Sequence, residues 1–256
     1  MTKLADILAD RVPICGGFQT HIPADWMQGR TSYGGLSAAL ALQAALLAEP
    51  DLPPLRSAQV SFVGPLAGEV NVTATKLRRG RHAAFIQADV ASEAGLGLRA
   101  VFVFMRDQQS VVDLQAARAD HRPPPPGTRL WTGPENFFAG NFEFLDLKLP
   151  ELGPAELLRW ARLKAHQGLD SLLHLITVAD ALPPAAIRLL GVGSPISSLT
   201  WIVNLLTPAP ETHDGWWLLA ARSDHARAGC ASQTMRVWNA DGLLIAEAMQ
   251  SVALFG

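Results

Sequence analysis

Residues 33–48 read YGGLSAALALQAALLA and contain no charged side chain. Alanine and leucine favour helix strongly, and a helix that is apolar on nearly every side is typically buried. The pair Gly34-Gly35 marks the beginning of this helix, and Pro50 follows its end. The sequence therefore predicts a helix at the centre of the fold, with other parts of the chain wrapped around it.

Four strands are predicted after this helix. Apolar and polar residues alternate with a period of two, most clearly in EVNVTATKL (residues 69–77), which is typical of a half-buried strand. Turns at Gly80 and Gly95 separate the later strands. We expect an antiparallel meander packed on the helix, with strands over 57–63, 69–77, 83–90 and 98–105.

The second half of the chain repeats this order. An apolar segment over 170–180 predicts a second buried helix, which is closed by Leu182-Pro183-Pro184. The preceding segment, 156–164, mixes charged and apolar residues and predicts an amphipathic helix. Four more strands are expected, over 197–207, 215–222, 231–238 and 243–255.

The turns of the two halves are spaced alike, which indicates an internal duplication. Gly80 and Gly229 are 149 residues apart, and Gly95 and Gly242 are 147 residues apart. Each half would leave an unpaired sheet edge, and such edges invite pairing. We therefore expect an α+β protein in which the two halves join edge to edge into one sheet around two helices.

The expected division of the chain is an N-terminal half over 1–106, a connector over 107–155 and a C-terminal half over 156–256. Four consecutive prolines and Gly127 keep the middle of the connector out of helix and central strand. Part of the connector must nevertheless pack, because five aromatic residues follow closely: Trp131, Phe137, Phe138, Phe142 and Phe144.

Composition narrows the function further. With 49% hydrophobic residues and a net charge of −2, the chain can bury a large core. The sequence has no dense stripe of Lys and Arg, so we expect no nucleic-acid partner. The longest apolar stretch, 36–48, is shorter than the ~20 residues of a membrane-spanning helix, and the N-terminus lacks a secretory signal. Two cysteines without metal-ligand spacing, Cys15 and Cys230, favour a reduced, cytoplasmic protein.

Short motifs occur in a fixed order along both halves. They are YGG (33–35), FVGPLAG (62–68), LRRGR (77–81), AD (179–180), SLTW (198–201), DGW (214–216) and DGLLIA (241–246) followed by Gln250. Together they resemble acyl-CoA thioesterases of the double hotdog type, similar to acyl-CoA thioesterase II, over about residues 15–256. The resemblance implies hydrolysis of an acyl-CoA thioester in fatty acid metabolism, without a cofactor or metal, by a homo-oligomer.

The family site consists of an aspartate, a threonine or serine and a glutamine that hold a water molecule. Carried over to this chain, the aspartate is Asp180 and the glutamine is Gln250. The hydroxyl falls on Ser198, with Thr200 as the competing register. A partly buried carboxylate can act as the base, while the serine and glutamine orient the water.

Tyr33, Gly34, Gly35 and Thr200 are the expected substrate-binding residues. The amides of the glycine pair suit an oxyanion, because free N–H groups and the positive dipole end coincide at a helix N-terminus. Each residue also has a structural interpretation: the glycines could serve close packing, and Tyr33 could be an aromatic plug.

Departures from the family pattern leave a second function open. Ala181 follows Asp180 where better-studied members carry histidine, Ser198 replaces threonine, and Asn204 and Leu206 stand where an aromatic residue and a histidine are usual. A non-catalytic acyl-CoA-binding protein on the same fold is the alternative. Other classes lack support: a hotdog dehydratase needs a paired Asp and His, Gly-x-Ser-x-Gly is absent, and Gly191-x-Gly193 is no phosphate loop.

Overall fold

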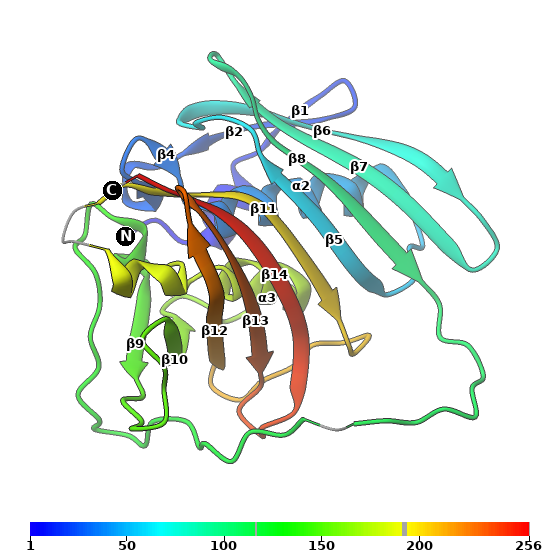
Figure 1. The fold of residues 1–256 in the computed structure, drawn as a ribbon. Coiled ribbons are helices and arrows are strands. Elements are labelled where there is room, and N and C mark those ends of the chain that lie inside the picture. The colour runs from blue at the N-terminus through cyan, green and yellow to red at the C-terminus, as the bar shows by residue number, and fades with distance from the viewer. Residues whose placement is uncertain (116, 191–193, 256) are drawn as a thin grey trace.

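A computed structural model describes residues 1–115, 117–190 and 194–255, so Gly191 and Gly193 lie outside the described residues. Within these ranges, twelve strands form one antiparallel sheet that curves around two helices (Figure 1). The strand order is β1-β2-β6-β7-β8-β5-β11-β14-β13-β12-β10-β9, and β3 pairs with β4 separately. The first half supplies β1 (Val12–Ile14), β2 (Gly17–Ile22), β3 (Met27–Gln28), β4 (Thr31–Ser32), β5 (Leu55–Phe62), β6 (Gly68–Arg79), β7 (Ala83–Ser92) and β8 (Gly95–Met105). The rest of the chain supplies β9 (Phe142–Asp146), β10 (Glu156–Leu163), β11 (Ile196–Leu205), β12 (Trp216–Arg227), β13 (Cys230–Trp238) and β14 (Leu244–Leu254).

Two helices lie inside the curve of the sheet. The first, α2 (Gly34–Ala48), packs against β6, β7 and β8 and crosses α3 (Ser171–Ala179). The carboxylate of Asp170 caps α3 by accepting hydrogen bonds from the backbone N–H groups of Leu172 and Leu173. Shorter helices are α1 (Leu4–Ala9) and the 3₁₀ turns η1 (Ala24–Trp26), η2 (Phe138–Asn141) and η3 (Ala185–Leu189). No helix of the described residues is long and apolar enough to cross a membrane.

The two halves join through β5 and β11. These strands pair antiparallel from Thr200 opposite Ser61 to Asn204 opposite Ser57. The sheet therefore continues across the duplication, and the prediction that the halves join edge to edge is confirmed.

The predicted meander of four strands is wrong in one respect. Only β6, β7 and β8 follow one another in the sheet, whereas β5 lies on the far side of β8, with Phe62 opposite Leu98. The residues that link β5 to β6 do not form a hairpin, because these two strands are not neighbours in the sheet. In this linker, the N–H groups of Val63 and Gly64 both donate to the carbonyl of Gly97. The linker thus passes beside the beginning of β8, and β5 is left as the edge that meets β11.

The predicted amphipathic helix at 156–164 is the strand β10 instead. Its charged residues pair across the sheet with β9: Arg159 binds Asp146 and Arg162 binds Glu143, each at 2.6 Å. The Arg159 guanidinium also lies 4.6 Å from the centre of the Trp131 ring. These cross-strand contacts outweigh the local helix preference.

Part of the expected connector belongs to the C-terminal sheet. The strand β9 and the turn η2 lie inside residues 107–155, and they bring Phe138, Phe142 and Phe144 into the core. The expected packing is confirmed for these three aromatic residues, whereas Phe137 is half-buried and Trp131 is exposed. The division into 1–106, 107–155 and 156–256 stays a prediction.

Candidate active site

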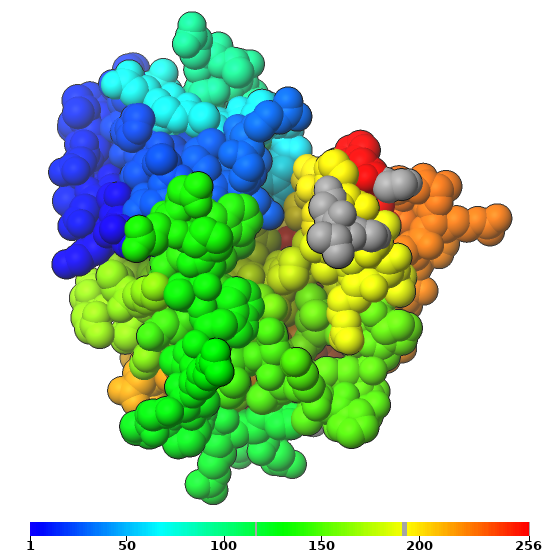
Figure 2. Space-filling view, turned by 90° about the vertical axis from the view of Figure 1, so that its left-hand side faces the viewer, coloured from blue at the N-terminus to red at the C-terminus, as the bar shows by residue number. Residues whose placement is uncertain are grey.

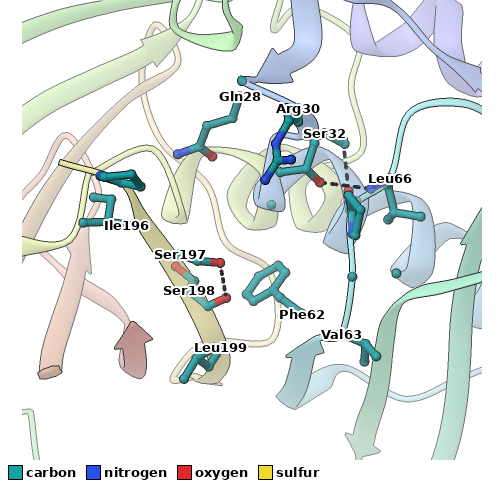
Figure 3. A pocket seen from close by; sticks show the side chains of 18 of the residues that line it. Gln28, Arg30, Ser32, Phe62, Val63, Leu66, Ile196, Ser197, Ser198 and Leu199 are labelled. Carbon is teal, nitrogen blue, oxygen red and sulfur yellow. Dashed lines mark hydrogen bonds between the residues drawn. The ribbon is translucent and has the colours of Figure 1, made fainter. Parts of the chain in front are cut away.

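A cavity of about 720 Å³ opens between the two halves. In the space-filling view, the blue N-terminal surface and the yellow surface near the beginning of β11 stand on either side of a hollow (Figure 2). Gln28 and Arg30 reach in from the β3–β4 hairpin, and Phe62 lies across from Ser198 (Figure 3). Asp180 lines the same cavity.

The end of α3 and the beginning of α2 meet at Asp180. A methyl group placed on Gly34 would lie 2.5 Å from Oδ2 of Asp180, so only glycine leaves room for the carboxyl there. The backbone N–H of Gly35 donates a hydrogen bond to the carboxylate. The glycine pair therefore serves both close packing and contact with an acid, and the free amides at the start of α2 favour a negative charge.

Gln250 links the terminal strand to this acid. Its side chain is 2% exposed, and its Nε2 donates to Oδ1 of Asp180 at 2.7 Å. The alternation of β14 places Ala248, Gln250 and Val252 on the inner face, as the sequence predicted. The structure thus brings together two predicted site residues that are 70 positions apart in the chain.

Burial raises the pKa of Asp180 from 3.8 to about 7, although the hydrogen bonds from Gln250 and Gly35 act to lower it. A carboxyl with this pKa is partly ionised at neutral pH and can still take up a proton. This combination suits a general base.

Ser198 and Thr200 differ in where their hydroxyls lie. Ser198 lines the cavity, and its Oγ is 3.5 Å from Oε1 of Gln250. A bulge in β11 separates the two residues, and Thr200 is exposed, opposite Ser61 and Ser251. The structure brings Ser198 to Gln250 and leaves Thr200 on the outer face of the sheet.

Tyr33 is a buried structural side chain. Its hydroxyl donates to the carbonyl of Thr177 at 2.6 Å, and its ring stacks on Phe138 with centroids 4.1 Å apart. Tyr33 is not among the described residues that line the cavity. Burial, and secondarily the charge of Asp180, raise the pKa of this hydroxyl well above 10. These contacts fit the aromatic plug rather than the predicted substrate contact.

Gln233 on β13 is a buried residue of the site that the sequence interpretation missed. Its Nε2 donates to Oε1 of Gln250 at 2.7 Å. The signal was present, because the alternation of β13 puts Ala231, Gln233, Met235 and Val237 on one buried face. Arg30 and Gln28 were also missed, since nothing in their local sequence connects the hairpin to Asp180.

Other ionisable groups of the interior lie elsewhere. His174 stacks on His166 and meets Trp217 edge to face, and burial lowers its pKa to about 4. Over the residues that the structure describes, no group of three or more His, Cys, Asp or Glu side chains could hold a metal ion.

Comparisons with solved structures identify the fold class as double hotdog. A conserved hot dog protein of unknown function from Alicyclobacillus acidocaldarius superposes with a TM-score of 0.84 at 21% identity, over 100% of this chain and 99% of that chain. A putative thioesterase II from Thermobifida fusca superposes with a TM-score of 0.83 at 20% sequence identity, over 100% of this chain and 98% of that chain. The acyl-CoA thioesterase II TesB2 of Mycobacterium marinum superposes with a TM-score of 0.75 at 18% sequence identity, over 99% of this chain and 97% of that chain. At these identities the likeness shows the fold alone, and it confirms the predicted α+β double hotdog.

Sequence profiles identify the family. The acyl-CoA thioesterase N-terminal domain matches residues 22–105, and the acyl-CoA thioesterase C-terminal domain matches residues 114–254. The chain therefore belongs to the acyl-CoA thioesterase family. No curated protein sequence matches it significantly.

Proposed function

We propose that this protein hydrolyses an acyl-CoA thioester to a free acid and coenzyme A by attack of an activated water. The observation that carries the proposal is the Asp180 carboxyl. It lines a cavity of about 720 Å³, its pKa is raised to about 7, and Gln250 holds it at 2.7 Å. Ser198 and Gln250 orient the water, which lies against the carboxylate.

In the proposed reaction, Asp180 takes a proton from the water as its oxygen bonds to the thioester carbonyl carbon. The carbonyl oxygen becomes an oxyanion, which the amide of Gly34 at the N-terminus of α2 stabilises. The carbon–sulfur bond then breaks, and the departing thiolate takes the proton from Asp180. The carboxylate is restored, and no other group is needed to balance the reaction.

The test is release of thiol from a panel of acyl-CoAs with chains from acetyl to palmitoyl, combined with direct binding measurements. We expect saturable thiol release with at least one chain length. Tight binding of an acyl-CoA without thiol release would instead establish a non-catalytic acyl-CoA-binding protein. Absence of both would overturn acyl-CoA as the ligand.

We also propose that the protein forms a homo-oligomer through the outer face of the sheet. Ile202 and Met249 pair across β11 and β14, and their side chains are 44% and 52% exposed. An exposed apolar pair at the centre of a long sheet is a candidate contact with a second copy. Light scattering should give more than the monomer mass, and Ile202→Lys combined with Met249→Lys should reduce that mass.

A further inference from the structure

Gln233 stands directly opposite Gln250 on the neighbouring strand, and both side chains face the interior. Gln233 is 2% exposed and, like Gln250, is not among the described residues that line the cavity. Its contacts are instead with Gln250, with Met235 and with the backbone of η3. Gln233 therefore has no evident role in holding a substrate.

The backbone N–H of Ala185 sets the direction of a chain of hydrogen bonds. This N–H, at the first residue of η3, donates to Oε1 of Gln233 at 2.7 Å. A backbone amide can only donate, so the oxygen of Gln233 must face it and the NH₂ group must face the other way. The Sδ of Met235, a weak acceptor 3.6 Å from Nε2, fits the same orientation.

The orientation of Gln233 then determines that of Gln250. Nε2 of Gln233 donates to Oε1 of Gln250 at 2.7 Å, so the NH₂ group of Gln250 faces Asp180. A flipped Gln250 would set two NH₂ groups against each other, which is costly in a buried site. It would also present an acceptor to Asp180, which only a protonated carboxyl could satisfy.

We infer that Gln233 is a positioning residue, which holds the amide of Gln250 in the orientation that donates to the ionised form of Asp180. This inference rests on the proposed function, in which that ionised carboxylate removes the proton from water. Gln233 acts through Gln250 and touches neither the water nor the thioester.

Few other described side chains near Asp180 carry a charge or titrate. Tyr33 feels the charge of Asp180 but is itself neutral, because burial raises its pKa well above 10, and Arg30 lines the same cavity. The side chains that β11, β13 and β14 bring to the site, those of Ser198, Gln233 and Gln250, do not titrate. The beginning of α2 contributes glycines, and Phe62 of β5 is apolar.

The test is the variant Gln233→Leu, which keeps the volume and removes the hydrogen bonds to Ala185 and Gln250. We expect the acid limb of the pH dependence of kcat/KM to move upward by about one pH unit, since a hydrogen bond to the ionised form is weakened. The rate at pH 6 should fall about tenfold, while the rate above pH 9 approaches that of the wild type. A uniform loss at every pH would overturn the inference, because a merely structural defect has that effect.

Two further variants keep the test decisive if Gln233→Leu folds poorly. Ala185→Pro replaces the N–H that orients Gln233 with a ring methylene, which also pushes the Gln233 oxygen away. Proline is favoured at this first helical position, and the preceding Pro184 has φ −52° and ψ 132°, which a residue before proline adopts. This variant should shift the acid limb in the same direction by less. Thr234→Val, at the exposed neighbouring position on β13, is the matched control and should leave the profile unchanged.

A readout without substrate separates this inference from the proposed function. In protein labelled with ¹³C at the aspartate carboxyl, the Asp180 signal is identified by its loss in Asp180→Asn, and its titration is followed by NMR. Its midpoint should rise in Gln233→Leu and not in Thr234→Val, and equal midpoints in folded protein would overturn the inference. If the wild type releases no thiol, the proposed function fails while this titration still decides what Gln233 does.

Discussion

The two central helices occupy corresponding places in the two halves but contribute different parts to the site. Helix α2 is the longer, from Gly34 to Ala48, and offers the acid only the backbone at its N-terminus. Helix α3, from Ser171 to Ala179, is followed directly by Asp180. One half therefore supplies space and amides at the point where the helices meet, and the other supplies the carboxyl.

The last strands of the two halves differ in the same way. The inner face of β8 carries Phe102 and Phe104, both fully buried, whereas the inner face of β14 carries Gln250. Asp180, Gln250, Gln233 and Ser198 all come from the C-terminal half. The hydrogen-bonded side chains of Asp180, Gln250 and Gln233 thus lie in one half of the duplicated scaffold. The other half forms the facing wall of the cavity, and its buried polar contact at the site is the pair Ser32 and Ser37.

Replacement of each of the two acids at the ends of α3 by asparagine is the strongest test of this comparison. Asp180→Asn should lower kcat/KM for thioester hydrolysis by about 10³-fold, because the amide cannot accept the proton of the water. Asp170→Asn at the other end should retain nearly full activity, since asparagine caps a helix as well as aspartate does. Thiol release by both variants measures the difference, and an active Asp180→Asn would refute the proposed base.

Gly34→Ala tests the contribution of the N-terminal half. The added methyl group would meet Oδ2 of Asp180 at 2.5 Å and the ring of Phe62 at 3.0 Å, so the carboxyl must move. We expect a loss in kcat of about 10²-fold, as a displacement of about 1 Å at a reacting group produces. Ser37→Ala, one turn further along α2 and also on the cavity wall, is the control and should change kcat little. Full activity of Gly34→Ala would mean that this close approach has no catalytic role.

The smallest effect expected is on stability. Because burial raises the pKa of Asp180 from 3.8 to about 7, the folded protein holds a proton there that the unfolded chain releases between those pH values. The contribution of this group to the free energy of unfolding is therefore largest below about pH 4 and is lost as the pH rises to about 7. Asp180→Asn, which does not ionise, should exceed the wild type in free energy of unfolding at pH 8 by about 1–2 kcal/mol. Urea unfolding at pH 5 and pH 8 measures this, and the gain should shrink at pH 5.

Several parts of the fold and site were predictable from local pattern. The uncharged run that begins at Gly34 predicted the buried helix α2, and the turns at Gly80 and Gly229 predicted the duplication. The alternation around Gln250 placed that side chain inward, where it meets Asp180. The same alternation would have found Gln233, if a buried glutamine had been sought on each strand.

Other features could not be predicted from local pattern. The segment of β10 has the composition of an amphipathic helix, and its arginines became strand residues only through their pairing with β9. The place of β5 beside β8 depends on pairing between residues more than 30 positions apart, such as Phe62 and Leu98, to which the linker adds hydrogen bonds to Gly97. Ser198 could not be separated from Thr200 without the bulge in β11.

The amino-acid sequence alone determined which segments are buried, which have the period of a helix or a strand, and that the chain is built from two similar halves. These properties follow from the polarity of neighbouring residues, which the chain carries locally. The tertiary structure decided the order of the strands, the face on which each hydroxyl lies and the direction of the hydrogen bonds from Ala185 to Asp180. Those properties depend on atoms far apart in the chain, whose hydrogen bonds and burial exist only after the two halves have closed on each other.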